Sequence, residues 1–274
     1  MNRNVIDYVH RVPYNQLGDQ LLHYLLNFLQ GFVEYPGEMQ QKDIAIKLIA
    51  CRNLDAYVFS RLTAHMTRML MEKVIKERPQ LLIGTLSCGT IEDIKNQKEE
   101  LLQFAYDAGM LHDIGALSLY RLMLMSARSW MDEESAMYRC HAAAGAEILM
   151  RCESTRPFAP IAIGHHVYYN GKGGYPADYC RADNPVQIVT DMVTIAAYAS
   201  RMTEQMTHDI MPIYTVAEVS ERIGREAGTM FHPELSRMWL SMEKELSEYL
   251  QSGRKEAYIE ATGLLRGQDP LSNC

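Results

Sequence analysis

Apolar residues recur at spacings of three and four along almost the whole chain, and this feature most restricts the fold it can adopt. Such spacing places apolar side chains on one face of a helix, whereas the alternation typical of strands is weak here. We therefore predict an all-α fold. The expected helices span residues 16–33, 39–52, 54–78, 91–113, 117–129, 132–153, 157–167, 185–206, 215–227 and 232–251.

Two stretches interrupt the helical pattern and divide the chain. Residues 79–90 (PQLLIGTLSCGT) and 169–185 (YNGKGGYPADYCRADNP) contain Gly and Pro signals and predict loops. The first 50 residues are amphipathic but too few for a typical domain of about 100 residues. We predict an N-terminal helical extension (1–53) that packs on the main body or forms a homodimer, a main domain (54–250) and a C-terminal tail (251–274).

Composition excludes several classes of protein. The formal net charge is −7, which argues against a basic nucleic-acid-binding surface. No N-terminal signal peptide is evident, and the apolar runs fall short of the roughly 20 residues that span a bilayer. The six cysteines form no C-x-x-C pair, which favours reduced thiols and disfavours a cysteine-ligated zinc site. We expect a cytoplasmic protein that contacts neither membrane nor nucleic acid.

Polar, ionisable side chains lie unexpectedly in apolar segments. The stretch GMLHDIGALSL (109–119) reads as buried, yet it carries His112 and Asp113 side by side, and a buried carboxylate needs a partner or a metal. Helical spacing turns His65, His141 and Asp191 toward apolar faces as well. His165 and His166 end an apolar stretch, and because adjacent histidines project about 100° apart on a helix, both reach one site only at a helix end or kink.

Each of these seven residues alone is compatible with a hydrogen-bonded core position, but together they indicate a metal centre. No buried Lys or Arg is evident in the sequence to neutralise the carboxylates. Imidazole and carboxylate groups are ligands for Fe, Mn or Zn. Seven ligands exceed the needs of one ion, so we predict two divalent ions bridged by Asp113. Two close ions lower the pKa of a shared water and favour in-line displacement at phosphorus, which predicts a phosphoester hydrolase.

The motifs also resemble those of the HD-GYP family, a branch of the HD metal-dependent phosphohydrolases. The resemblance covers roughly residues 54–245. It rests on LHDIG (111–115), HAAAGAEIL (141–149), HHVYYNGKGGYP (165–176), HMTR (65–68), TDMV (190–193) and AGTMFHPEL (227–235).

This resemblance implies an HD-type helical bundle that hydrolyses cyclic di-GMP through a hydroxide that bridges the two metals, with Asp113 as catalytic residue. Its final product is either pGpG or GMP. It implies one ion bound by His65, His112, Asp113 and Asp191, and another bound by Asp113, His141, His165 and His166. Iron and manganese are favoured, and zinc also fits. Gly174, Tyr175 and Pro176 would shape a loop that contacts the substrate and a diguanylate-cyclase partner.

Three positions depart from the family pattern. Ala116 stands where the family usually has a lysine that meets the scissile phosphate. Arg61 stands where members with a third metal carry Glu, which predicts two metals. After the late aspartate, the family often has Asp-Arg-x-Tyr-Arg-like residues, whereas this chain has ASRMTEQ (199–205). Arg201 would take over a phosphate contact there, and an exposed helix arginine explains it at least as well. Two alternatives stay open: a phosphohydrolase for another nucleotide, and a weak or inactive signalling module that acts through protein contacts.

Overall fold

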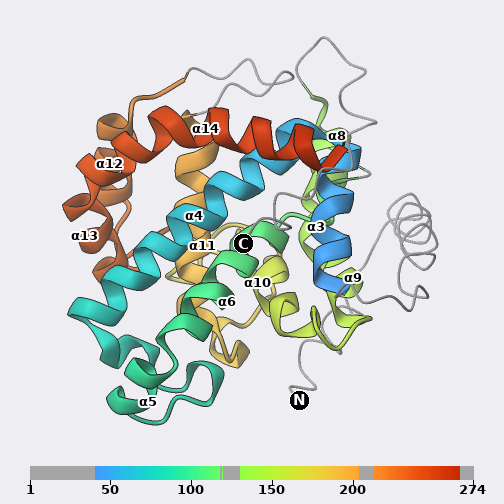
Figure 1. Ribbon diagram of the computed structural model, residues 1–274. Coiled ribbons are helices and arrows are strands. Elements are labelled where there is room, and N and C mark those ends of the chain that lie inside the picture. Colours follow the sequence, from blue (N-terminus) through green and yellow to red (C-terminus); the bar gives the residue numbers. More distant parts are fainter. Residues whose placement is uncertain (1–40, 118, 120–129, 204–212, 266–274) are drawn as a thin grey trace.

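The computed structural model describes residues 41–117, 119, 130–203 and 213–265 (Figure 1). The predicted helix 16–33, nearly all of 117–129, the end of 185–206, residues 1–40 of the N-terminal extension and residues 266–274 of the tail lie outside these ranges.

The all-α prediction is confirmed: the described residues form helices and no strand. The elements are α3 (Gln41–Arg52), α4 (Leu54–Glu77), η1 (Pro79–Leu82), η2 (Thr85–Ser87), α5 (Ile91–Asn96), α6 (Lys98–Leu111), α8 (Asp132–Arg139), α9 (His141–Met150), η3 (Arg156–Phe158), α10 (Ala159–Gly164), η4 (Arg181–Asp183), α11 (Gln187–Thr203), α12 (Val216–Arg225), α13 (Pro233–Ser241) and α14 (Glu243–Leu265). None of the described helices combines the length and apolar character that crossing a bilayer requires.

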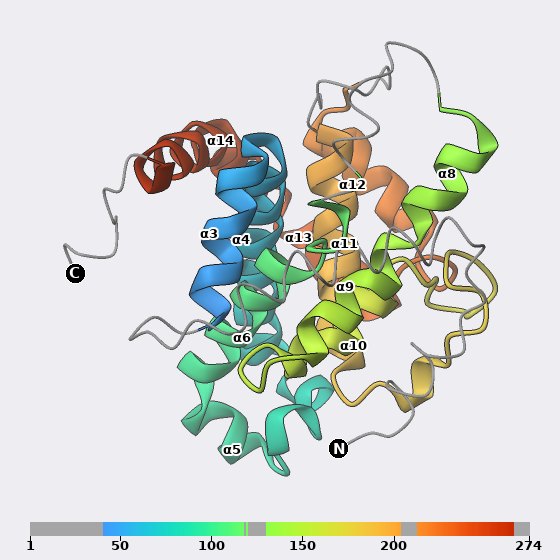
Figure 2. The same cartoon turned by 90° about the vertical axis from the view of Figure 1, so that its right-hand side faces the viewer.

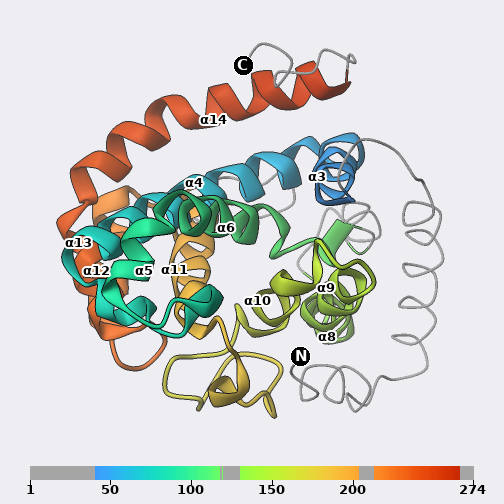
Figure 3. The same cartoon turned by 60° about the horizontal axis from the view of Figure 1, so that its bottom comes forward.

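Helix α4 lies at the centre of the bundle. It packs against α6 and α11, and α14 runs along its outer side (Figures 1 and 3). The Asn53 side chain starts this helix by accepting hydrogen bonds from the backbone N–H groups of Asp55 and Ala56, at 2.9 and 3.2 Å. Because neighbours surround α4, its buried residues occupy most of its circumference, as at Tyr57, Leu62 and Leu70.

Helix α9 packs against α10, α10 in turn packs against α11, and the loop that follows α10 lies beside them (Figure 2). The sequence predicts one helix over 132–153, but the chain breaks into α8 and α9 at Cys140. It likewise predicts a helix over 157–167, whereas α10 ends at Gly164, directly before His165 and His166. Both differences place a histidine at the end of a helix.

The structure also bears on the predicted extension and tail. Helix α3 buries Leu48, Ile49 and Ala50 in the common core, so residues 41–52 pack on the main body. Helix α14 continues through the predicted boundary at residue 250 to Leu265, and Ala257 and Ala261 on its inner side are fully buried. Residues 251–265 therefore belong structurally to the bundle.

Candidate metal centre

Three helix ends meet at one point and supply five of the predicted site residues. His112 and Asp113 follow the last residue of α6, His141 begins α9, and His165 and His166 follow α10. The approach of these segments depends on Gly115. A Cβ atom there would lie 2.1 Å from the backbone oxygen of His141 and 2.5 Å from the backbone nitrogen of Gly145, so only glycine permits the contact.

Three of the histidines are held in the same way. The Nδ1 atoms of His112, His141 and His165 each lie 2.7–2.8 Å from the backbone oxygen three residues earlier, which belongs to Gly109, Tyr138 and Ala162 respectively. A carbonyl can only accept, so each Nδ1 carries the proton and each Nε2 presents its lone pair. This tautomer is the one that metal-binding histidines adopt when a backbone carbonyl orients them.

The ring nitrogens of three histidines lie close together, and one of them contacts Asp113. Nε2 of His141 lies 3.1 Å from Oδ1 of Asp113 and 3.1 Å from Nε2 of His166. The ligand atoms of His141, His165 and His166 all lie within 4.8 Å of one another. Nε2 of His112 and Oδ1 of Asp113 are buried without a hydrogen-bond partner. An unpartnered carboxylate oxygen beside a cluster of histidine nitrogens fits a cation, so the donor set of Asp113, His141, His165 and His166 suits a divalent metal.

Burial keeps the histidines of the cluster in the neutral form that metal binding requires. It lowers the pKa of His141 and His165 to about 4, and it lowers the pKa of His112 and His166 well below the usual value. These imidazoles are therefore neutral at pH 7. In contrast, burial raises the pKa of Asp113 to about 6, although His165 and Arg201 act to lower it.

The loop after α10 contributes an aromatic side chain to the same site. Tyr175 stacks on His166 with ring centroids 4.3 Å apart. Gly174 precedes it at a φ of +78°, where a Cβ atom would lie 1.8 Å from the backbone oxygen of His166. Of the three predicted loop residues, Tyr175 lines the pocket beside the histidines, Gly174 permits the turn, and Pro176 follows half-buried.

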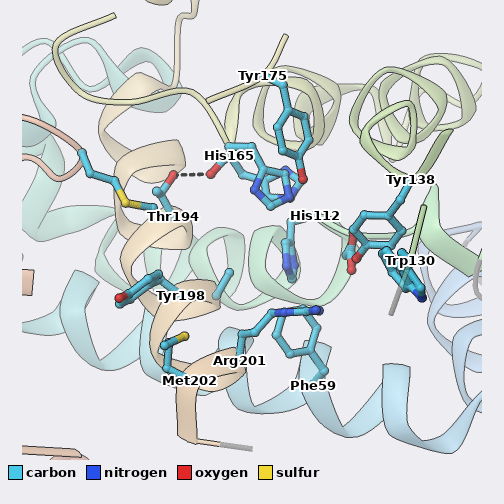
Figure 4. Close-up of a pocket in the computed structure, with 14 residues that line it drawn as sticks. Phe59, His112, Trp130, Tyr138, His165, Tyr175, Thr194, Tyr198, Arg201 and Met202 are labelled. Atoms are coloured by element: carbon cyan, nitrogen blue, oxygen red, sulfur yellow. Dashed lines mark hydrogen bonds between the residues drawn. The ribbon is translucent and has the colours of Figure 1, made fainter. Parts of the chain in front are cut away.

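A pocket of about 360 Å³ opens beside the cluster and is largely aromatic (Figure 4). Its wall includes His112, Asp113, His165 and His166. Among the described residues that line the pocket, Arg201 is the sole Arg or Lys. The aromatic side chains of the wall are Phe59, Trp130, Tyr138, Tyr175 and Tyr198. This combination of apolar area with a few convergent polar groups is typical of a small-molecule site.

His65 does not join the cluster. Its ring lies against Tyr106 of α6 and Tyr249 of α14, with centroids 5.1 and 5.3 Å apart, and burial lowers its pKa to about 3. On α4 it is Phe59 that lines the pocket. Six residues further along a helix, a side chain projects about 120° away from that face, so His65 points toward α6 and α14.

Asp191 lies one helical turn before the pocket and has partners of its own. Arg181 contacts both of its carboxylate oxygens, at 2.8 and 2.9 Å, and Gln187 donates a hydrogen bond to it at 2.9 Å. Both side chains of this ion pair are mostly buried, with exposed fractions of 14% and 6% for Arg181 and Asp191. The expectation that no buried cation neutralises the carboxylates is thus corrected for Asp191.

The two other departures from the family pattern also have clear surroundings. Ala116 is buried in a small apolar cluster with Phe59 and Ala197. Arg61 donates a hydrogen bond to Glu260 at 2.8 Å, which ties α4 to α14. Arg61 therefore faces the α14 side together with His65.

Sequence reasoning missed several residues of the pocket, among them Phe59, Tyr138 and Thr194. Tyr138 left a usable signal: it lies three residues before His141, the spacing at which its carbonyl accepts from the His141 ring. Thr194 donates hydrogen bonds to the backbone oxygens of His165 and Thr190, at 2.8 and 2.9 Å. That contact joins α11 to the end of α10 and is not evident from local sequence.

Comparison with known proteins gives one informative relative. A protein of Thermotoga maritima named cyclic di-GMP phosphodiesterase is 25% identical over 177 residues, which are 64% of this chain and 46% of the relative. The chain thus spans about half the length of the curated relative it matches. No model of a known protein family matches the chain. This distant similarity supports a relationship to HD-GYP-type proteins at most.

Proposed function

We propose that the protein is a metal-dependent phosphodiesterase that opens cyclic di-GMP to linear pGpG. The observation that carries this proposal is the convergence of His141, His165, His166 and Asp113 at the edge of a pocket that also holds Arg201. The distant similarity to a protein named cyclic di-GMP phosphodiesterase supports the substrate.

In this proposal, different residues of the site bind the metal, the attacking water, the phosphate and the base. The three histidines and Asp113 would hold a divalent ion, which when bound supplies Lewis acidity toward a phosphoryl oxygen and toward water. Asp113 would also accept a hydrogen bond from the attacking water. Arg201 would bind a phosphate oxygen through its guanidinium, which remains charged at all physiological pH values. The aromatic wall of the pocket would stack against a guanine base.

The test is hydrolysis of cyclic di-GMP by protein loaded with Mn²⁺ or Fe²⁺, with products separated by chromatography. We expect pGpG from the wild type and a loss of about 100-fold or more in His141→Ala, since this variant removes a ligand at the centre of the cluster. The matched control is His65→Phe, which keeps a ring between Tyr106 and Tyr249 and should retain turnover. Equal turnover in wild type and His141→Ala would overturn the proposal.

A second candidate is a metal-binding signalling module without turnover. The observation that favours it is Ala116, whose apolar contacts with Phe59 and Ala197 leave no cation at that position. The same samples decide between the two, because this candidate predicts bound metal without any pGpG or GMP. A third outcome, hydrolysis of another nucleotide with cyclic di-GMP untouched, would keep the chemistry and change the substrate.

A further inference from the structure

The fold brings together one of the two predicted sets of metal ligands but not the other. In the first set, the ligand atoms of His141, His165 and His166 lie within 4.8 Å of one another, and Asp113 joins them through its 3.1 Å contact with His141. The set that pairs His112 and Asp113 with His65 and Asp191 is not brought together. His65 lies between two tyrosine rings, and Asp191 is paired with Arg181.

Apolar side chains occupy the space that faces His112. From α4 it is Phe59 that lies beside His112, with ring centroids 5.5 Å apart. Ala116 and Ala197 pack with that phenyl ring and complete the apolar surface. Thr194 of α11 directs its hydroxyl proton to backbone oxygens. Among the described residues, neither α4 nor α11 therefore adds a nitrogen or carboxylate ligand on the His112 side.

A positive charge already stands in this part of the pocket. The Arg201 side chain extends from α11 toward His112 and Phe59 (Figure 4). A divalent ion on the His112 side, held by two protein ligands only, would be repelled by this guanidinium.

We propose that the centre binds one metal ion, through Asp113, His141, His165 and His166, and that Arg201 supplies the positive charge that a second ion would offer to the substrate phosphate. The number of ions stands independently of any turnover. The role of Arg201 toward phosphate rests on the proposed function. The ion would serve the reacting centre, and the guanidinium would hold a non-bridging phosphate oxygen.

The metal count is tested by titrating metal-free, full-length protein with Mn²⁺ and by elemental analysis after removal of unbound metal. We expect one equivalent per chain in the wild type, in His65→Phe and in Asp191→Asn, and none in His141→Ala. Two equivalents in the wild type, with one lost in His65→Phe or Asp191→Asn, would overturn the proposal, as would no binding. Thermal melting of every variant verifies that each is folded.

The role of Arg201 is tested with inorganic phosphate as the probe, titrated into the Mn²⁺-loaded protein. Arg201→Met should keep one Mn²⁺ per chain and weaken phosphate binding about 10-fold or more, since it removes a charged hydrogen bond. Unchanged phosphate affinity would overturn this part. If cyclic di-GMP is not hydrolysed while the count and the phosphate effect hold, only the proposed function fails, because neither measurement depends on turnover.

Discussion

Nε2 of His141 lies 3.1 Å from Oδ1 of Asp113, and this contact joins α9 to the segment that follows α6, whose backbones approach closely at Gly115. The relationship makes the metal-binding geometry a property of helix packing. His141 begins α9 and Asp113 follows α6, so neither residue reaches the other unless these helix ends approach closely. The site is therefore sensitive to the size of residues that never contact a metal.

Gly115→Ala should weaken metal binding although no ligand is changed. The new methyl group would collide with the backbone of α9, and overpacking of this kind costs about 1–3 kcal/mol of stability. Mn²⁺ titration and thermal melting measure both effects. Gly89→Ala is the matched control, because its Cβ would meet Asp93 at an ordinary 3.7 Å. Equal Mn²⁺ affinity in the two variants would contradict this account.

Metal affinity should fall as pH decreases through about 6. In the metal-free protein the Asp113 carboxyl has its pKa raised by burial to about 6, so below that pH it is protonated and must release the proton when metal binds. Above pH 6 the Asp113 carboxyl is already deprotonated, so this group no longer makes metal affinity depend on pH. His141 and His165, with pKa values of about 4, add protons only at lower pH. Calorimetric Mn²⁺ titrations in buffers of different ionisation enthalpy count the protons released on binding. An Mn²⁺ affinity that does not change between pH 5 and pH 8 would refute the prediction.

Ala116→Lys should raise turnover of cyclic di-GMP and lower stability. The added ammonium would emerge from the apolar cluster of Phe59 and Ala197 into the pocket, where a cation stabilises charge on phosphate. The longer side chain would disturb that cluster. Ala116→Met provides the same length without charge and should lower stability alone. A similar kcat in the two variants would show that the charge does not reach the phosphate.

Arg181→Met should destabilise the protein more than most single substitutions. It leaves the Asp191 carboxylate buried with Gln187 as a remaining partner, and removing one member of a buried ion pair costs about 3–5 kcal/mol. Adding Asp191→Leu should recover much of that loss, because the buried charge is then gone as well. Urea unfolding of both single variants and the double variant gives the coupling. Additive effects would mean that the ion pair contributes no coupling to stability.

The sequence by itself determined the all-α character and most of the cluster. Helical spacing predicted the main helices, and the burial expected for GMLHDIGALSL led to His112 and Asp113. Adjacent histidines on a helix project about 100° apart, so His165 and His166 can share a site only at a helix end or kink, and α10 ends directly before them. These inferences depend on local periodicity and on the cost of burying a charge, and both can be judged from a short stretch of sequence.

Tertiary structure decided which face each polar residue meets. Helix α4 is covered by α6, α11 and α14, so several of its faces are apolar and periodicity cannot tell the pocket side from the others. His65 consequently packs between tyrosines while Phe59 lines the pocket. The partner of Asp191 comes from the long loop that holds Arg181, whose position no local pattern specifies. Long-range packing therefore fixed which of the predicted ligands share one site.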